Sequence, residues 1–198
     1  MSLTIEQVGV DCLSRIADIP IAFTVNSIFR VEPPADGTWG LVLHEVDLQQ
    51  PLVMDYDTYE ERNAPAHWPE DYDVSNWAFF IAVDDGRDVG SAVVATDTPG
   101  LPFLGDRRDW ALLWDIRVRP EVRRQGIGTK LLRRAADWAR QRGCTQLKID
   151  TQNINVPACR FYAKQGCKLG GIDLHTLAHV PKLAGTYPLI LLLWYLDL

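Results

Sequence analysis

The sequence predicts an α/β fold in which a mixed β-sheet is covered by helices on both faces. Two observations predict it. Before residue 119, short apolar runs alternate with turn-forming residues, as in a series of antiparallel strands. After residue 126, segments of helical period alternate with strand-like segments and give the order β-α-β-α-β.

The first half of the chain contains seven expected elements. Residues 4–18 suggest a short strand and a helix, and FTVNSIFRV (23–31) and GLVLHEVDL (40–48) resemble strands joined by the turn-forming EPPADGT. After a loop over 55–75, WAFFIAVDD and VGSAVVAT flank Gly86 as a hairpin. WALLWDIRV (110–118) is apolar enough to be an interior strand of the sheet.

The second half changes its period after Gly126, where apolar residues recur at helical spacing up to a stop at Gly143. A strand over 145–151 follows, and then a helix over 155–165 with Pro157 in its first turn and Gly166 at its end. A strand from Cys167 and a last strand over 187–196 complete the chain.

Composition favours one ordinary soluble domain, with 198 residues of which 47% are hydrophobic and 23% charged. The N-terminal residues do not resemble a secretion signal, and the apolar run 189–196 is too short to span a bilayer, so we expect a cytoplasmic protein without a membrane partner. The four cysteines show neither a CxxC motif nor ligand spacing to the four histidines. We therefore expect neither a metal site nor a disulfide framework, and mostly buried thiols.

Charge is unevenly distributed along the chain. The net charge of -6 disfavours a nucleic-acid partner. A basic segment, residues 117–142, holds nine Lys/Arg against two acidic residues, and an acidic segment, residues 45–73, holds nine Asp/Glu against Arg62. Both segments could be solvated surface; alternatively, the basic one binds an anion and the acidic one a cation.

The stretch RRQGIG (123–128) lies between a predicted strand and a predicted helix. Glycines there let unpaired backbone amides and the positive helix end meet at one anion, and a pyrophosphate suits such a site. Neither the P-loop motif nor the GxGxxG dinucleotide motif is present. Taken alone, the stretch is as compatible with a plain tight turn.

A second motif follows some thirty residues later, and the two together identify a family. The pattern Arg123-x-x-Gly126-x-Gly128 followed by Asn155-x-x-Ala158-x-x-x-Tyr162 resembles the GNAT superfamily of N-acetyltransferases over residues 75–198. Four segments, FTVNSIFRV, LVLHEVDLQQPL, WDIRVRPEVRRQGIGTKLL and DTQNINVPACRFYAKQGC, resemble its streptothricin acetyltransferases, which confer antibiotic resistance. Cys167 and the extension 174–188 depart from the superfamily pattern, and the extension could reshape the acceptor pocket.

The resemblance implies the GNAT fold, with a mostly antiparallel mixed sheet whose strands splay at an acetyl-CoA site. It implies one domain, 1–198, with an acceptor-side segment over 1–74 and an acetyl-CoA-binding core over 75–198. Acetyl-CoA would be the acyl donor, and no metal is expected. The strand residues Ile116, Arg117 and Val118 would border the pantetheine arm, and Ala158 would leave room for it. Asn155 would bind that arm or would simply cap its helix. The pyrophosphate would be held by the amides and charges of Arg123, Arg124, Gln125, Gly126, Ile127, Gly128 and Thr129.

Direct acetyl transfer needs an acid for the leaving thiolate and a base for the amine. Tyr162 matches the family's tyrosine and is the expected acid, although it could merely pack under the sheet. Asp115 and Asp150, on neighbouring strands, could bind a cationic amine and take its proton, or could only pair with Arg117 and Lys148. A bulge in the strand would change the side on which Asp115 lies.

The acceptor would be a small cationic amine. Glu45, Trp114, Asp115 and Asp150 are the expected acceptor residues. The acidic segment could add charge and cation-π contacts from Tyr56, Tyr59, Trp68, Tyr72 and Trp77, or could be a solvated loop. The expected function is acetylation of a primary amine, most concretely in a streptothricin-type antibiotic. Alternatives are a protein or peptide N-acetyltransferase and a non-catalytic acyl-CoA-binding regulatory module. A homodimer through the apolar strand 189–196 is possible, but burial of that strand explains it equally well.

Overall fold

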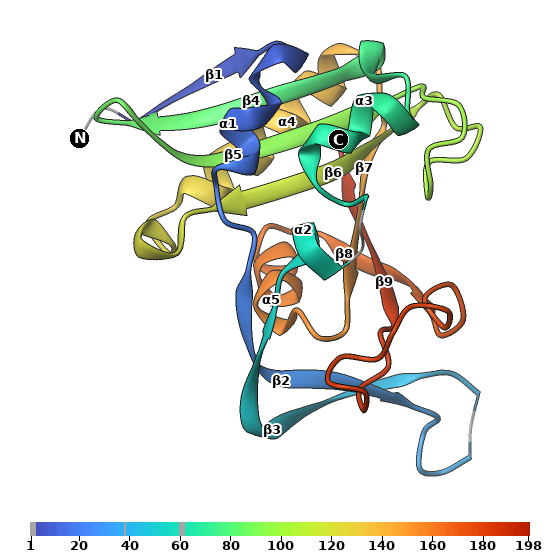
Figure 1. Cartoon of the computed structure of the whole chain (residues 1–198). Helices are drawn as coiled ribbons and strands as arrows, with labels where there is room; N and C mark the ends of the chain where they lie inside the picture. The colour runs from blue at the N-terminus through green and yellow to red at the C-terminus, as the bar shows by residue number, and fades with distance from the viewer. Residues whose placement is uncertain (1–2, 38, 60–61) are drawn as a thin grey trace. The chain divides into compact units, whose positions relative to one another are not determined.

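The computed structural model describes residues 3–37, 39–59 and 62–198 (Figure 1). The chain forms two compact units. The first comprises Met1–Ala22, Asp55–Asp150 and Tyr195–Leu198, and the second comprises Phe23–Met54 and Thr151–Trp194. Each is described by itself.

Five strands form the sheet of the first unit. They are β1 (Thr4–Val8), β4 (Trp77–Asp84), β5 (Arg87–Thr96), β6 (Trp110–Val118) and β7 (Gln146–Gln152), in the order β1-β4-β5-β6-β7. The first three neighbouring pairs are antiparallel, and β6 with β7 is parallel. This arrangement confirms the predicted mixed, mostly antiparallel sheet.

Helices cover both faces of this sheet (Figure 1). The long helix α4 (Ile127–Gln141) contacts β4, β5 and β6, and its Arg134 guanidinium lies 4.6 Å from the ring centre of Phe80. On the other face lie α1 (Leu13–Ala17) and α3 (Trp68–Asp71). Shorter elements are η1 (Val10–Cys12), α2 (Tyr56–Tyr59), η2 (Pro65–His67), η3 (Val74–Asn76) and η4 (Pro120–Val122). The segment 55–75, predicted as a loop, thus contains several short helical turns.

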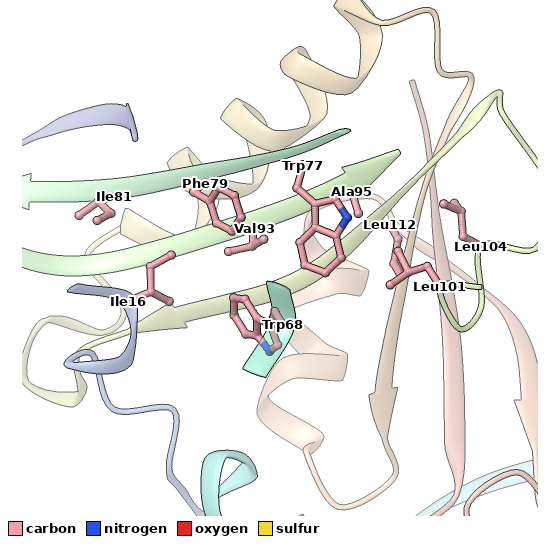
Figure 2. Close-up of a cluster of buried hydrophobic side chains, with 10 residues drawn as sticks. All are labelled: Ile16, Trp68, Trp77, Phe79, Ile81, Val93, Ala95, Leu101, Leu104 and Leu112. Atoms are coloured by element: carbon pink, nitrogen blue, oxygen red, sulfur yellow. The ribbon is translucent and has the colours of Figure 1, made fainter. Parts of the chain in front are cut away.

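A cluster of buried side chains fills the face covered by α1 and α3. Figure 2 shows Ile16 of α1 and Trp68 of α3 beside Trp77, Phe79 and Ile81, which alternate along β4. Period two in a strand places these three on one face and Phe80 on the other, which explains how one strand serves both helix layers. The remaining members of the cluster are Val93, Ala95, Leu101, Leu104 and Leu112.

The second unit contains a two-stranded antiparallel sheet of its own, formed by β2 (Phe23–Glu32) and β3 (Val42–Met54). It also contains α5 (Val156–Lys164), which contacts β2 and β8 (Lys168–Asp173). The last strand, β9 (Leu191–Asp197), is the neighbour of β8. The sequence predicted β2 and β3 as strands but did not separate them from the main sheet.

The last strand begins four residues later than predicted, at 191 instead of 187. The buried side chain of Asn153 explains the difference. Its Oδ1 accepts from the amide of Ile190 (2.8 Å), and its own backbone amide donates to the carbonyl of Ile190 (3.0 Å). Tyr187 in the same stretch forms an isolated bridge with Leu183, so the residues before β9 are held by these local hydrogen bonds and not by a continuous strand ladder.

Candidate active site

The turn at 123–128 forms a cradle of backbone amides. Arg124 and Gly126 both adopt positive φ, +65° and +85°, and Gly126 is the N-cap of α4 without a side-chain cap. Within the described part of the chain, none of the six amides from 124 to 129 donates to an acceptor. Consecutive free amides at a helix N-terminus bind anions. The structure therefore fits the pyrophosphate site that the sequence predicts.

Gly90 on β5 lets the first turns of α4 come close to the sheet. A Cβ at this position would lie 2.9 Å from the carbonyl of Arg117 and 3.0 Å from Cδ1 of Leu131. Only glycine avoids this overlap. Gly90 thereby sets the position of the helix end that carries the cradle.

The two arginines of the turn have different environments. The Arg123 guanidinium is half-buried and donates to the carbonyls of Val118 (2.9 Å) and Ala22 (3.1 Å), and burial lowers its pKa. Arg124 is exposed, and its side chain has no ion pair among residues 3–37, 39–59 and 62–198. Arg123 therefore fastens the turn to the protein, while Arg124 remains available to an anionic ligand.

Strands β6 and β7 pair only in their first halves. Their register runs from Trp110 opposite Gln146 to Leu113 opposite Ile149 and then stops, although β6 continues to Val118. The antiparallel register of β6 with β5 slips at the same place, where Trp114 is inserted as a β-bulge. The edge of β6 beyond Leu113 can therefore pair with an extended ligand, which agrees with the predicted splay.

Asp115 lies in a buried ion-pair cluster. Arg117 Nη2 is 2.6 Å from Asp115 Oδ2, and Arg117 Nη1 is 2.8 Å from Asp57 Oδ2. Burial lowers the pKa of Arg117, but the charge of Asp115 and the hydrogen bonds that Arg117 donates to Asp115 and Asp57 outweigh it, so the pKa is raised. The pairing of Asp115 with Arg117, one of the two sequence alternatives, is therefore present.

Asp150 has a different environment. No side-chain hydrogen bond to its carboxylate is found among the described residues. Burial raises its pKa to about 6, more than its backbone hydrogen bond and the charge of Lys148 lower it. The Lys148 ammonium donates to the carbonyl of Phe103 at 2.6 Å and lies 5.3 Å from the ring centre of Trp110, so the predicted alternative of a tight Asp150–Lys148 pair is not formed. A carboxyl with a pKa close to neutrality suits a general base.

In the second unit, α5 begins as the motif predicts. The side chain of Asn155 accepts from the amide of Ala158 at 3.1 Å and is the N-cap of the helix. Tyr162 is 5% exposed, and its ring packs 5.4 Å from that of Phe161 and 6.4 Å from that of Trp194. Capping by Asn155 is thus observed, whereas the roles of Asn155 and Tyr162 toward the pantetheine arm and the thiolate stay predictions.

Glu45, the predicted acceptor residue on β3, is engaged within the second unit. Its Oε1 accepts from the hydroxyl of Ser27 at 2.7 Å, and its Oε2 pairs with Arg160 of α5. The side chains of Glu45 and Arg160 are 31% and 67% exposed. This exposed pair is open to exchange with another cation.

The predicted aromatic contacts to a cation are partly wrong. Trp68 and Trp77 are 3% and 6% exposed, and their indoles donate to the carbonyl of Asn63 and the hydroxyl of Thr98. Both rings therefore belong to the core. Trp114 is half-buried, in edge contact with Trp68. Of the acidic segment, Glu60 and Glu61 lie outside the described residues.

Sequence reasoning missed Asp57, Arg160, Gly90 and Asn153. Asp57 was only a member of the acidic segment, and Arg160 was an unassigned position within the second motif; their ion-pair partners lie 60 and 115 residues away. No local pattern reveals such pairs. Gly90 carried a signal, since an isolated glycine within a strand often marks a close approach.

Three further observations concern metal ligands, membrane-spanning helices and the cysteines. Among residues 3–37, 39–59 and 62–198, no group of three or more His, Cys, Asp or Glu side chains is placed to hold a metal ion. The described helices are all too short or too polar to cross a membrane. All four thiols are free, and burial raises the pKa of Cys159 to about 12 and that of Cys167 to about 11.

Comparison with known proteins agrees with this geometry. A family model described as "Acetyltransferase (GNAT) family" matches residues 46–167, well over half of the chain. Streptothricin acetyltransferase of Streptomyces lavendulae is 31% identical over 152 residues, which are 77% of this chain and 74% of the relative. Streptothricin acetyltransferase A of Bacillus subtilis is 37% identical over 92 residues, which span 45% of this chain and about half, 51%, of that relative.

Solved structures share the fold. The crystal structure of nourseothricin acetyltransferase matches with a TM-score of 0.75 at 24% identity and covers 100% of this chain and 99% of its own. A candidate streptothricin acetyltransferase from Bacillus anthracis, solved in complex with acetyl coenzyme A, matches with the same TM-score at 23% identity, over the full length of both chains. At these identities the likeness shows the fold.

Proposed function

This chain belongs to the acetyltransferase (GNAT) family, and we propose that it transfers an acetyl group from acetyl-CoA to a primary amine of a small cationic molecule of the streptothricin type. One observation carries the donor half: the six free amides from 124 to 129 at the start of α4. Such a cradle binds a pyrophosphate with backbone groups alone. The exposed Arg124 beside it adds positive charge.

The unpaired edge of β6 has the second role toward the donor. Backbone groups of Ile116 and Val118 bind the pantetheine arm as an added strand would, and a nearby strand amide polarises the thioester carbonyl. Asn155 and Ala158 border the same arm. These assignments rest on the family motif and on the separation of β6 from β7.

Asp150 is the proposed base and Tyr162 the proposed acid. The amine attacks the thioester carbon only when it is neutral, so a carboxylate that takes its proton near pH 7 promotes the reaction. Asp150 fits because its pKa is raised to about 6 and no side-chain hydrogen bond engages its carboxylate within the described ranges. Tyr162 gives its hydroxyl proton to the departing thiolate of coenzyme A. Asp115 is not proposed as the base, because Arg117 engages both of its oxygens.

The proposed acceptor is supported by the acidic residues of the chain and by the names of two similar proteins. Glu45 on β3 and the acidic segment offer carboxylates to a molecule with several amines, and two curated relatives carry the name streptothricin acetyltransferase. Inactivation of a streptothricin-type antibiotic by acetylation would make the chain a resistance enzyme. A cytoplasmic location and one 198-residue domain remain part of this proposal.

The test is continuous measurement of thiol release from acetyl-CoA by the purified protein. Streptothricin, spermidine, an aminoglycoside and a lysine peptide serve as separate acceptors, and mass spectrometry locates the acetyl group on the product. We expect saturation at micromolar streptothricin and weaker turnover with the others. Preference for the lysine peptide would instead support a peptide acetyltransferase. Acetyl-CoA binding without thiol release from any acceptor would overturn the enzymatic proposal and favour a regulatory module.

A further inference from the structure

Four aromatic rings of the first unit form a cluster beside the point where β6 separates from β7. The ring centre of Trp114, at the bulge of β6, lies 5.3 Å from that of Trp77 and 5.4 Å from that of Tyr72. It lies 6.3 Å from the ring centre of Trp68. Figure 2 shows Trp68 and Trp77 among the buried side chains of this unit. Tyr72, which directly follows α3, stacks on Trp77 at 6.1 Å.

The four rings differ in what their polar atoms bind. The indoles of Trp68 and Trp77 are buried and donate to a backbone carbonyl and to a threonine hydroxyl. Tyr72 and Trp114 are only half-buried. Within the part of the chain that the structure describes, neither the Tyr72 hydroxyl nor Nε1 of Trp114 forms a hydrogen bond. The first two rings therefore serve the core, while the other two offer ring surface and two polar atoms to a ligand.

Asp150, the proposed base, lies on the same face of the sheet as these rings. The ammonium of Lys148, two residues before Asp150 on β7, lies 5.3 Å from the ring centre of Trp110, which packs against the buried cluster. Side chains two residues apart in a strand point to the same face. Trp114 packs against the same cluster. Trp114 and Asp150 are also the first residues after the last pair of β6 with β7, so they lie at the same level of the two strands.

The segment around Tyr72 is rich in negative charge. Tyr72 lies between Asp71 and Asp73, and Glu70 precedes them. Arg62 pairs with Glu70 and with Asp71. Three carboxylates against this one guanidinium leave the segment negative, which attracts cations to the neighbouring surface. The face of an aromatic ring binds an ammonium group, and tryptophan binds it best. The ligand that suits Tyr72 and Trp114 is therefore a cation.

From this arrangement we infer that Tyr72 and Trp114 hold a second ammonium group of the acceptor while its reacting amine faces Asp150. The inference rests on the proposed acetyltransferase function and deepens it, because it makes diamines and polyamines the preferred class of acceptor. Neighbouring strands lie about 5 Å apart in a sheet, and β6 and β7 separate beyond their last pair. Two amines separated by several carbon atoms suit this spacing.

The kinetic test compares cadaverine, a diamine, with aminopentanol, in which a hydroxyl group replaces the second amine. The wild type should have a KM for cadaverine at least about fivefold lower, beyond the advantage of two equivalent amines. Tyr72→Leu and Trp114→Leu should each reduce this preference at least about threefold, whereas Tyr72→Phe keeps the ring and should preserve it. Both acceptors meet the same variant, so the ratio of the two KM values is insensitive to a general loss of stability. A wild type without this preference, or leucine variants that retain it, would overturn the inference.

A binding experiment separates this inference from the proposed function, because it needs neither acetyl-CoA nor turnover. Choline and its neutral isostere dimethylbutanol are titrated separately, and NMR follows the indole Nε1–H signals, with Trp114→Phe identifying the signal of Trp114. Choline should shift this signal with a Kd at least about fivefold lower than that of dimethylbutanol, and Tyr72→Leu should weaken choline binding about threefold.

The outcomes of this titration are distinct. Equal affinity for the two probes, or a Trp114 signal that neither probe shifts, would overturn the cation site even in an active enzyme. Selective binding of choline by a protein that acetylates no amine would keep the cation site and refute only the enzymatic proposal.

Discussion

Arg117 Nη2 lies 2.6 Å from Asp115 Oδ2, and this ion pair engages one of the two carboxylates on the neighbouring strands β6 and β7. Nε of the same guanidinium lies 3.0 Å from the other oxygen of Asp115. Both oxygens of Asp115 are thus occupied by charge-assisted hydrogen bonds from the same buried guanidinium. Asp150, whose carboxylate has no such partner among the described residues, is therefore the residue that we propose as the base.

The first prediction distinguishes these two carboxylates. Asp150→Asn should lower kcat about 100-fold or more, as expected on loss of a general base. In the wild type, kcat/KM should rise with pH through about 6, since Asp150 acts when ionised. Asp115→Asn should keep this rise of kcat/KM with pH and should lower the Tm. A pH profile of Asp150→Asn identical to that of the wild type would exclude Asp150 as the base.

The second prediction concerns stability. Burial raises the pKa of Asp150 from 3.8 to about 6 in the folded protein, so the folded state binds this proton more tightly than the unfolded state. The free energy of unfolding should therefore fall as pH rises from about 4 to about 6, by at most ~3 kcal/mol. Asp150→Asn should remove this decrease in urea unfolding at pH 4, 5, 6 and 7. A difference between wild type and variant that is constant with pH would contradict the assignment.

The third prediction tests the amide cradle with two glycines. Gly126 and Gly143 stand at opposite ends of α4 with φ of +85° and +78°, and open space surrounds the Cβ position of each. Gly126→Val and Gly143→Val should each cost about 1–2 kcal/mol of stability through the strained backbone. Only Gly126→Val should weaken acetyl-CoA binding, by more than tenfold in calorimetry. Equal affinities of the two variants would place the pyrophosphate elsewhere.

The sequence predicts those features of the site that are set by residues close together in the chain, and it misses those set by distant contacts. Strand β6 occupies the predicted range 110–118, and α4 begins directly after Gly126, because apolar period and turn glycines are local signals. The bulge at Trp114 was raised only as an alternative, since it depends on the register with β5. The pair of Arg117 with Asp57 needs a contact over 60 residues, which no periodicity encodes.

The same distinction explains the two errors of the fold. The sequences of β2 and β3 have the ordinary pattern of strands. Which strands they pair with depends on tertiary contacts, and here, among the described strands, they pair only with each other. The late start of β9 follows from Asn153, whose buried amide binds Ile190. Burial likewise explains why Trp68, in the acidic segment, and Trp77, at the start of β4, cannot face a cation.

The fourth prediction addresses Tyr162. Its ring packs against those of Phe161 and Trp194 and the residue is 5% exposed, so Tyr162→Phe should keep the ring packing. If the hydroxyl protonates the leaving thiolate, kcat should fall about 100-fold while the Kd for acetyl-CoA changes little. Stopped-flow thiol release and calorimetry on the same preparation give both quantities. Unchanged turnover would remove Tyr162 from the mechanism.

The fifth prediction uses the pair of Glu45 and Arg160 to test the acceptor site. Both variants of this pair break the same ion pair, but they leave opposite charges behind. Glu45→Gln keeps an oxygen for the hydroxyl of Ser27 and removes the charge that would attract a cationic acceptor. Arg160→Gln removes the internal cation and leaves the Glu45 carboxylate open to the substrate.

The two variants should therefore change the KM for the acceptor in opposite directions. We expect Glu45→Gln to raise it about tenfold and Arg160→Gln to leave it unchanged or to lower it, because the ammonium no longer competes with a guanidinium. Since exposed ion pairs contribute about 0–1 kcal/mol, neither variant should lower the Tm appreciably. Steady-state kinetics at two salt concentrations provide the check, since the effect should shrink as salt rises. An equal rise in KM for both variants would mean that the pair serves the structure of α5 and β3 and does not bind the acceptor.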